Sequence, residues 1–586
     1  MDKIRQAMLA RLSDEDREAL RAVYAPVIVG APPQDASKHL CVTPEGEIRV
    51  YGVQKEHADP EEEGKRVYLA STDCGLSWKK HIVPENALGE ATYSPETGLY
   101  MQCFPQEERK TYPADYPDPE DGCYVLINRA GYDAPAEKIV RLCDKTLHFQ
   151  KLPYYIASRN RWLIAAECRH PDTEKFIVTA ISDDGGETWR VQELPHAPLF
   201  VPAPPHRGTR WQDYSCEPTV VELSDGTLLM HERTSLDFHY MRLSHDGGET
   251  WSEPRPSLFH GTLTMPVLHK LSDGRILHFW CNNQPLPEMD HEAQWPPLGR
   301  DEKTGVWEDV FTNRDVNHLA ISEDDGKSWR GFRELHLNGL RNREDFRSTG
   351  GTDSRDKSVH QGELLELPFG KVLISFGQNA AARRMMIFDP AWLYETARTE
   401  DFRYGLDHVT THMYVRSNSG GYRGFSGHCS WNRLPGALLC QDPDGNFEEA
   451  LLIARVRDER LLFERQGVVW NFPAAKRGHV DIRLRVRGAG VRVCLTDHWY
   501  NACDETVGDF APARFDIDDV EKEKWIDARI DYDESAARLS LNGAPAAEAP
   551  LRCAAPYGLC YVHIQTLAEE EDFAGTLIKR LSMAAD

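Results

Sequence analysis

The chain has 586 residues, of which 41% are hydrophobic and 27% charged, and its formal net charge is −25 at pH 7. This length is too great for one hydrophobic core and predicts two domains. The negative charge argues against nucleic acid and anionic membranes as partners, so any anionic ligand needs a local basic pocket. The 14 cysteines show no CxxC pair, which predicts buried thiols rather than a disulfide framework or a zinc site. We expect no metal and no other cofactor.

Residues 1–24, MDKIRQAMLARLSDEDREALRAVY, contain no long apolar run. They predict a short amphipathic helical segment, with Ser13 as a helix cap before DEDRE, and not a signal peptide. No stretch elsewhere in the sequence is apolar enough for a transmembrane helix. As written, the chain is expected to be cytoplasmic, although a secreted or periplasmic protein whose leader had been removed would read the same.

An eight-residue motif recurs along the chain. Each copy has a hydroxyl residue, an aspartate two positions later, a glycine two further on and a tryptophan at the end. The aspartate can accept backbone hydrogen bonds in a turn, the glycine permits positive φ and the tryptophan covers apolar surface, so each copy predicts a β-hairpin. We interpret Leu142 to Phe149 as a degenerate fifth copy. The complete copies are Ser71–Trp78, Ser182–Trp189, Ser244–Trp251 and Ser322–Trp329.

Repeated hairpins in a long chain predict an all-β fold of the propeller type, with four-stranded blades around a central channel. The motif copies and the equivalent hairpins VELSDGTLLM, HKLSDGRILHF and LELPFGKVLIS indicate six blades in residues 25–405. The sixth blade lacks the motif, and we expect a strand from the N-terminal segment to close it. The motif lies between the outer strands, on the face away from a propeller's usual ligand site, so its aspartates are expected to be structural.

The pattern changes after about residue 405. The stretch SNSGGYRGFSGHCSWNRLPG is typical of a linker or a packed loop. Farther on, Val480, Ile482, Leu484 and Val486 alternate with charged residues, which indicates a half-exposed strand. Short alternating strands over residues 406–586 predict a lectin-like β-sandwich. Such a domain either stiffens the propeller or binds sugar, and the fold alone does not decide between these roles.

The eight-residue motif is the Asp-box of the sialidase-like proteins, which the chain resembles over roughly its first two thirds. Exo-sialidases hold the substrate carboxylate with three arginines and use a tyrosine nucleophile, an assisting glutamate and an acid/base aspartate. Arg233 in GTLLMHER and Arg314 in RDVNHLAISEDDGKSW match the second and third arginines, and Glu217 in SCEPTVVEL matches the glutamate. A guanidinium suits this role because it makes two parallel bonds to a carboxylate. The alternative for these residues is ordinary ion pairs and turn contacts.

The family's motif for the first arginine is absent, and HLCVTPEGEIRVY stands in its place. Lys38, Arg159 and Arg169 are candidates for this role, and Arg159 is included in the expected substrate-binding set. The resemblance also places Asp59 where the family has its acid/base aspartate. Asp59 lies in a loop rich in glutamates, so a solvated acidic loop is the alternative.

At the tyrosine position of the family the chain has His360 and Gln361. This pair is similar to that of a sialidase-related glycoside hydrolase family, numbered 181. His360 can act as a base on water or as an acid on the leaving group, or it can be a buried core residue. We expect an ionised Glu217 to favour its imidazolium form. Tyr214 and Trp211, in GTRWQDYSCEP, either line a sugar pocket or pack their loop.

These features favour an exo-glycosidase that removes a terminal acidic sugar, with sialic acid as first candidate, without a tyrosine nucleophile. A sialylated glycan or another acidic sugar is therefore the expected partner. Two alternatives remain open: another propeller carbohydrase, such as an arabinan hydrolase or a uronate lyase with a histidine base, and a non-catalytic glycan-binding propeller. Arginines converging beside Glu217 and His360 would argue against the non-catalytic alternative.

Overall fold

The computed structural model describes residues 2–33, 38–53, 65–104, 122–168, 174–201, 212–283, 314, 316–339, 341–342, 359–377, 382–414, 433–445, 448–461 and 463–586. These residues form mostly β-strands and few helices, which confirms the predicted predominance of β-structure. No described helix is both long and apolar enough to cross a membrane. The described cysteines are free thiols and most are buried, as predicted.

The N-terminal segment forms two helices, α1 (Asp2–Arg11) and α2 (Asp14–Ala22), where one was expected. Ser13 separates them and caps α2, as predicted. Its hydroxyl accepts a 3.1 Å hydrogen bond from the N–H of Asp16, whose carboxylate accepts one of 3.3 Å from the N–H of Ser13. The apolar side chains of both helices share a core with the first and last sheets described below.

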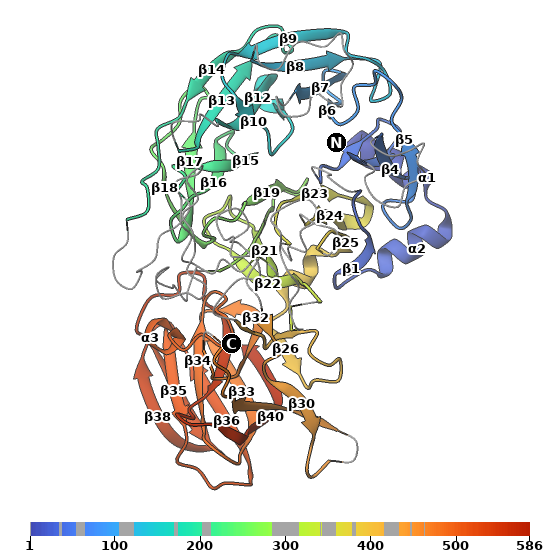
Figure 1. The fold of residues 1–586 in the computed structure, drawn as a ribbon. Coiled ribbons are helices and arrows are strands. Elements are labelled where there is room, and N and C mark those ends of the chain that lie inside the picture. The colour runs from blue at the N-terminus through green and yellow to red at the C-terminus, as the bar shows by residue number, and fades with distance from the viewer. Residues whose placement is uncertain are drawn as a thin grey trace.

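Antiparallel sheets follow one another along the first two thirds of the described chain (Figure 1). The first three sheets contain β2 (Cys41–Val42), β3 (Ile48–Val53), β4 (Arg66–Ser71) and β5 (Lys79–Ile82); β6 (Thr92–Ser94), β7 (Leu99–Phe104), β8 (Cys123–Asn128) and β9 (Lys138–Cys143); and β10 (Leu147–His148), β11 (Tyr154–Ile156), β12 (Arg161–Cys168), β13 (Phe176–Ser182) and β14 (Arg190–Glu193). The next three contain β15 (Cys216–Glu222), β16 (Leu228–Arg233), β17 (Phe238–Ser244) and β18 (Arg255–His260); β19 (Val267–Lys270), β20 (Ile276–Trp280), β21 (Val316–Ser322) and β22 (Arg330–Leu337); and β23 (Gly362–Glu366), β24 (Val372–Phe376) and β25 (Arg384–Phe388). In each sheet, strands that follow one another in the chain pair, except that β10 and β11 both pair with β12.

The N-terminal strand β1 (Val27–Gly30) completes the last of these sheets. It pairs antiparallel with β25, with Val27 opposite Ile387, and so gives that sheet its fourth strand. Figure 1 shows the two strands side by side although about 360 residues separate them in the chain. The prediction that the N-terminal segment supplies a closing strand is confirmed.

The Asp boxes form the turns between the third and fourth strands of their sheets. In the box Ser182–Trp189, the Ser182 hydroxyl accepts a 2.8 Å hydrogen bond from the N–H of Gly186 and donates one to Asp184. Asp184 also accepts a 2.9 Å bond from the N–H of Thr188. The other three boxes repeat these contacts. The boxes therefore close hairpins, as their spacing predicts.

The segment Leu142–Phe149 is not a fifth box, and this prediction is wrong. The segment runs from the end of β9 into β10, so it connects two sheets rather than two strands of one sheet. It lacks the hydroxyl residue that binds the glycine N–H in the true boxes. The β8–β9 turn is instead closed by Asn128, whose amide donates to the carbonyl groups of Gly131, Ala134 and Pro135.

The C-terminal region forms two sheets that enclose one core. One contains β30 (Leu438–Gln441), β31 (Glu449–Arg455), β40 (Asp572–Ala585), β33 (Gly478–Val486), β36 (Trp525–Tyr532), β37 (Ala536–Leu541) and β38 (Ala544–Pro550), with β26 (Ala397–Glu400) also on β40. The other contains β27 (Val409–Thr410), β32 (Gly467–Ala475), β39 (Leu559–Thr566), β34 (Val491–Thr496) and β35 (Ala513–Ile517). The pair β28 (Met413–Tyr414) and β29 (Arg433–Leu434) and the helix α3 (Val507–Phe510) lie outside these sheets. The predicted alternation in β33 is confirmed, and its apolar side chains join the core. β26 belongs to this region although it precedes the expected boundary at residue 405.

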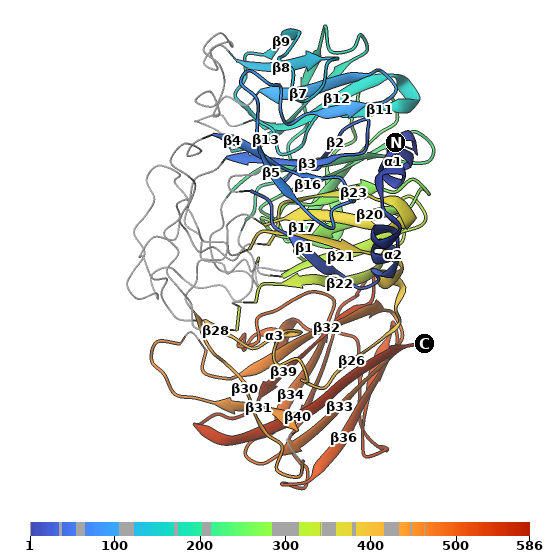
Figure 2. The same ribbon diagram turned by 90° about the vertical axis from the view of Figure 1, so that its right-hand side faces the viewer.

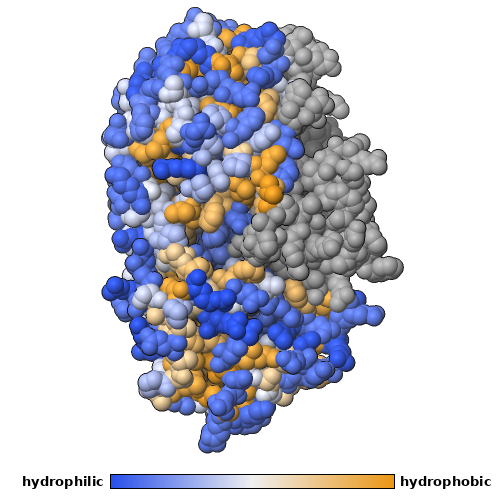
Figure 3. Space-filling model, turned by 90° about the vertical axis from the view of Figure 1, so that its left-hand side faces the viewer, coloured by the Kyte–Doolittle hydropathy of each residue, from blue (hydrophilic) through white to orange (hydrophobic). Residues whose placement is uncertain are grey.

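The two parts of the chain pack together where β32 and β39 meet β21 and β22 (Figure 2). Asn471 accepts a 3.0 Å hydrogen bond from the N–H of Glu334 and donates one of 3.0 Å to the carbonyl of Phe332. Tyr561 donates a 2.8 Å bond to Glu334 and is hydrogen-bonded to Nε2 of His318. The junction is therefore a buried interface with both polar and apolar contacts. Figure 3 shows a mostly hydrophilic outer surface on one side of the molecule, interrupted by small hydrophobic groups.

Candidate functional site

Glu217 and Arg233 form a buried ion pair at one end of the sheet β15–β18. They lie on neighbouring strands, whose register places Cys216 opposite Arg233. Nη1 of Arg233 donates a 3.0 Å hydrogen bond to Oε2 of Glu217. Nη2 of Arg233 also lies 3.8 Å from Oδ2 of Asp213. One guanidinium therefore interacts with two carboxylates.

Gln361 links this ion pair to the N-terminal part of the chain. Its Nε2 donates a 2.9 Å hydrogen bond to Oε1 of Glu217, and its Oε1 accepts one of 3.3 Å from Nζ of Lys38. The two bonds fix the orientation of the amide, because only its nitrogen donates and only its oxygen accepts. A continuous polar chain therefore runs from Lys38 through Gln361 and Glu217 to Arg233.

Three of the four residues of this polar chain, all but Arg233, have a positive φ angle. The φ angle is 70° at Lys38, 47° at Glu217 and 61° at Gln361. It is 52° at Leu263, whose carbonyl accepts a hydrogen bond from Arg314. Positive φ is uncommon outside glycine, and such strained residues cluster at catalytic and ligand-binding sites. The backbone thus marks the same place as the charged side chains.

His360 contacts Arg314 and is fully buried. Nη1 of Arg314 lies 3.1 Å from Nε2 of His360, and the N–H of Met265 points to Nδ1 from 3.2 Å. Both neighbouring groups are donors, whereas a neutral imidazole has one acceptor nitrogen and an imidazolium has none. These contacts therefore favour the neutral form of His360. The expectation that an ionised Glu217 favours the imidazolium form stays a prediction.

The ion pair stays charged despite its burial. Burial alone would raise the pKa of Glu217, but Arg233, Lys175 and Arg314 together outweigh this effect and the pKa is lowered. Burial likewise opposes the charge of Arg233, yet its pKa is raised because Glu217 is so close. Four cationic side chains, Lys38, Lys175, Arg233 and Arg314, meet three carboxylates, Glu167, Asp213 and Glu217. The site is thus locally positive in a strongly acidic protein.

The Asp boxes lie at the opposite end of the strands from this site. Leu228, the first residue of β16, pairs with Ser244, which begins an Asp box, whereas Arg233 is the last residue of β16. Five residue steps of about 3.3 Å separate the two ends by roughly 16 Å. Side chains of the box therefore cannot reach a substrate held by Arg233.

Arg159 lies at the end of its sheet that carries the Asp box. It does not join the site, so its assignment to substrate binding is wrong. It is exposed on the turn between β11 and β12. Next to this turn, Trp162 pairs with Ser182, the first residue of a box. Nη2 of Arg159 donates a 3.1 Å hydrogen bond to the carbonyl of His245, inside the following box.

Tyr214 packs its loop. Its ring stacks on that of His196, with 4.2 Å between centroids, and contacts the core shared by the second and third sheets. This matches the packing alternative and places Tyr214 away from the polar chain. Asp59, Trp211 and Arg169 lie outside the described residues.

Three groups of the site were not singled out in the sequence. Asp213 lies four residues before Glu217, and this proximity of two acidic residues is a signal that could have been used. Leu263 and Met265 act through backbone atoms, for which a sequence gives no signal. Lys38 was considered only as a substitute for the missing arginine.

A cavity of about 440 Å³ lies between the sheets, and its lining does not include Lys38, Glu217, Arg233 or Gln361. Each of the six sheets contributes a strand to the cavity wall, and this strand lies at or next to an edge of the sheet. These strands are β2, β6, β11, β15, β19 and β23. The wall includes His39 and Pro218, which directly follow Lys38 and Glu217, and Ile4 of α1. The cavity is therefore bounded by strands from six successive sheets and by the chain neighbours of two site residues.

Part of the chain matches a known repeat domain, and the matched part includes residues of this site. Residues 145–345 match the model of the BNR repeat-like domain. This range contains three Asp boxes together with Glu217, Arg233 and Arg314. It confirms the predicted repeat. No curated protein matches the chain.

Sialidases are among the solved structures similar to the chain. Trypanosoma rangeli sialidase is 10% identical, with a TM-score of 0.35, over 94% of this chain and 91% of that one. The intramolecular trans-sialidase from Ruminococcus gnavus, in complex with oseltamivir carboxylate, is 12% identical, with a TM-score of 0.36, over 62% and 95%. A protein of unknown function from Dyadobacter fermentans is 15% identical, with a TM-score of 0.37, over 62% and 97%.

Proposed function

We propose that this protein is a glycoside hydrolase of sialidase type that removes a terminal acidic sugar, with sialic acid as the first candidate. The observation that carries the proposal is the convergence of Arg233, Arg314 and Lys38 on Glu217 and the His360–Gln361 pair. A locally positive site attracts an anionic sugar that the net charge of −25 would repel. We also propose that the six successive sheets are the blades of a propeller and that the C-terminal sheets form a lectin-like sandwich.

Arg233 and Arg314 bind the substrate carboxylate in this proposal. A carboxylate competes well for guanidinium N–H groups because the bonds are charge-assisted and can be bidentate. In the free protein Arg314 donates to Leu263 and faces His360. When Arg314 turns to the substrate, Nε2 of His360 is exposed to the reacting water. Nε2 acts as a base in the tautomer that carries its hydrogen on Nδ1, so the N–H of Met265 has to turn away from Nδ1 at this step.

His360 then accepts a proton from the attacking water, the bond between the anomeric carbon and the leaving oxygen breaks, and the leaving oxygen takes up a proton from solvent. Its neutral form, which the contacts with Arg314 and Met265 favour, is the form that can act as a base. Gln361 cannot form the aryl glycoside that a tyrosine forms, so water attacks the anomeric carbon directly. Direct attack inverts the configuration of that carbon. Glu217, held ionised by Arg233, stabilises the positive charge that develops on the sugar.

A turnover assay on a fluorogenic sialoside, beside a uronide and an arabinoside, tests the proposed function. Release from the sialoside is expected, together with a loss of about two to four orders of magnitude in His360→Ala. Proton NMR of the first-formed product is expected to show inversion. Turnover of the uronide or the arabinoside alone would replace the acidic-sugar hydrolase with another carbohydrase. Binding of sialosides without turnover would indicate a glycan-binding propeller, and retention would exclude direct attack by water.

A further inference from the structure

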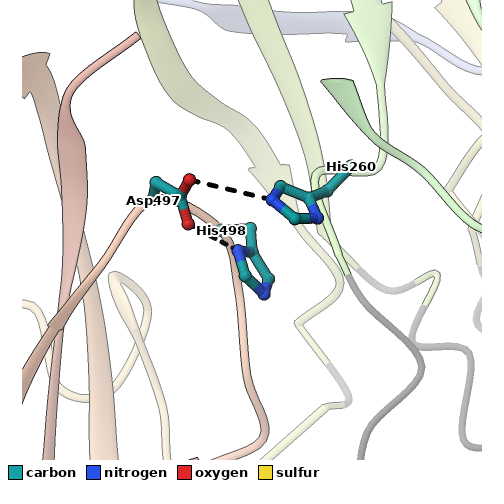
Figure 4. Close-up of side chains that lie close together, drawn as sticks. All are labelled: His260, Asp497 and His498. Carbon is teal, nitrogen blue, oxygen red and sulfur yellow. Dashed lines mark hydrogen bonds and ion pairs between the residues drawn. The ribbon is translucent and has the colours of Figure 1, made fainter. Parts of the chain in front are cut away.

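Two histidines and an aspartate meet where β18 faces the C-terminal sheets (Figure 4). His260 is the last residue of β18, whereas Asp497 and His498 directly follow β34. Oδ2 of Asp497 lies 3.7 Å from Nε2 of His260, and Oδ1 lies 2.7 Å from Nδ1 of His498. The three ligand atoms lie within 4.8 Å of one another. Segments more than 230 residues apart thus bring two imidazoles and a carboxylate to one point.

The arrangement of these side chains is close to that of a metal site. The two imidazole rings stack with 3.8 Å between centroids, and a nitrogen of each points to the carboxylate of Asp497 (Figure 4). Ligand atoms around four-coordinate Zn²⁺ lie about 2.0–2.2 Å from the ion and therefore roughly 3.3 Å from each other. The 3.7 Å separation between His260 and Asp497 needs little change. Nδ1 of His498 lies 2.7 Å from the other oxygen, Oδ1, so Asp497 either binds the ion through both oxygens or turns until one oxygen faces both imidazoles.

The end of β20 holds both ligand-bearing segments in place. Nε1 of Trp280 donates a 2.9 Å hydrogen bond to the carbonyl of His260. Two residues later, Nδ2 of Asn282 donates one of 3.1 Å to the carbonyl of Asp497. The carbonyl of Asn282 accepts a further bond of 2.9 Å from the N–H of Trp499. Ligands positioned in this way lose little conformational freedom when an ion binds.

We propose that His260, Asp497 and His498 bind a divalent transition-metal ion of the Zn²⁺ class, which joins the C-terminal sheets to the sheet β15–β18. Two imidazoles and one carboxylate are a donor set that Zn²⁺ uses together with one water molecule. Imidazole ligands disfavour Ca²⁺ and Mg²⁺, which prefer oxygen. His260 and Asp497 keep 15% and 14% of their side-chain surface exposed, so an ion and its water can reach them. The site is separate from the polar chain around Glu217, and the ion stabilises the junction.

Metal titration of the full chain tests this site. The protein is first freed of metal with a chelator and then titrated with Co²⁺, whose visible absorption reports tetrahedral coordination, and with Zn²⁺ in competition. We expect one saturable Co²⁺ equivalent that Zn²⁺ displaces, and a higher melting temperature with Zn²⁺ bound. His260→Ala and Asp497→Asn are expected to weaken binding by more than about 10- to 100-fold, the loss seen when even a supporting group of a metal site is removed.

The control variant is His81→Ala, which removes an exposed histidine on β5. It should bind Co²⁺ with the wild-type stoichiometry and affinity. Asp497→Asn retains an amide that can still bond to His498, so it keeps the test valid if His260→Ala fails to fold. Two results would overturn the proposal: no saturable equivalent in the wild-type protein, or equal binding in wild type, His260→Ala and Asp497→Asn.

Discussion

Gln361 donates a 2.9 Å hydrogen bond to Glu217, a residue 144 positions earlier in the chain. Both residues have a left-handed backbone conformation, and Lys38 fixes the other end of the Gln361 amide. A neutral donor therefore lies beside Glu217. This contact holds the Glu217 carboxylate in position without neutralising its charge.

Gln361→Glu is expected to make the activity depend on pH, with the higher activity at low pH. A carboxylate in place of the amide would face the carboxylate of Glu217, and two such groups share one proton because both cannot ionise in contact. The protonated side chain can donate to Glu217 as the amide does, so activity should rise as the pH falls through the raised pKa of the pair. In Gln361→Ala the donor is lost at every pH, which costs about 10- to 150-fold in turnover. Identical pH profiles of kcat for wild type and Gln361→Glu would contradict the assigned contact.

Arg233→Ala is expected to reduce kcat/KM by an amount equivalent to about 2–5 kcal/mol, because Glu217 and the substrate carboxylate both lose a charged partner. Arg233→Lys should recover little, since an ammonium cannot reproduce the planar fork of donors. The control is Arg159→Ala, which removes an exposed arginine at the box end of its sheet. Full activity of Arg233→Ala, or an equal loss in Arg159→Ala, would remove Arg233 from the substrate site.

Trp329→Ala is expected to lower the free energy of unfolding by about 3–5 kcal/mol. The indole is 7% exposed, its Nε1 donates a 3.0 Å hydrogen bond to Gly326, and its edge contacts the ring of Phe259. Trp189 makes the same bond within its own box but is only partly buried, so Trp189→Ala should cost less. Denaturant unfolding measures both losses. The activity per folded molecule should not change, because the boxes lie at the end of the strands opposite Arg233; a folded but inactive variant would contradict this.

The features that were predicted correctly depend on residues close together in sequence. The Asp boxes close within eight residues, the cap at Ser13 within four, and the alternation in β33 within one strand. Local hydrogen bonds and side-chain periodicity determine these features. The fifth box was predicted wrongly because Asp144 and Phe149 have the right spacing but the hydroxyl and glycine that make the turn are absent.

The site was predicted only in part because its contacts join distant strands. Glu217 and Arg233 were found through the resemblance, and their neighbouring strands bring them together. The contact between Lys38 and Gln361 spans 323 residues and depends on how the first and last sheets meet. Arg159 was misplaced because the direction of a strand decides which end of the sheet a turn occupies, and residue type does not reveal this. The contact between His260 and Asp497 gives no signal in the sequence because the two residues meet only at the junction of the two parts.

Tyr561→Phe is expected to destabilise the junction by about 1–3 kcal/mol. Removing the hydroxyl deprives Glu334 and His318 of a hydrogen-bond partner, and both are buried. Tyr532 is the matched control, because its hydroxyl is also buried but has no hydrogen-bond partner among the described residues. Tyr532→Phe should leave the stability unchanged or raise it slightly. Equal effects of the two substitutions on the free energy of unfolding would contradict a role of the Tyr561 hydroxyl.

Asp504→Asn is expected to flatten the dependence of stability on pH. Asp504 is fully buried, and although its Oδ1 accepts two hydrogen bonds from Thr506, burial raises its pKa from 3.8 to about 6. A carboxyl group whose pKa is raised in the folded state contributes its full stability below the unfolded value. That contribution is lost as the pH rises through about 6. The difference of about two pKa units corresponds to about 3 kcal/mol.

The uncharged amide of Asp504→Asn keeps an oxygen for Thr506 and cannot ionise. The free energy of unfolding of the variant, relative to wild type, should therefore increase by up to about 3 kcal/mol between pH 4 and pH 7. Asp531→Asn, which changes an exposed aspartate on β36, serves as the control and should show no such trend. Denaturant unfolding at several pH values measures all three proteins. Parallel curves for wild type and Asp504→Asn would mean that Asp504 is ionised in the folded protein at no greater cost than in the unfolded chain.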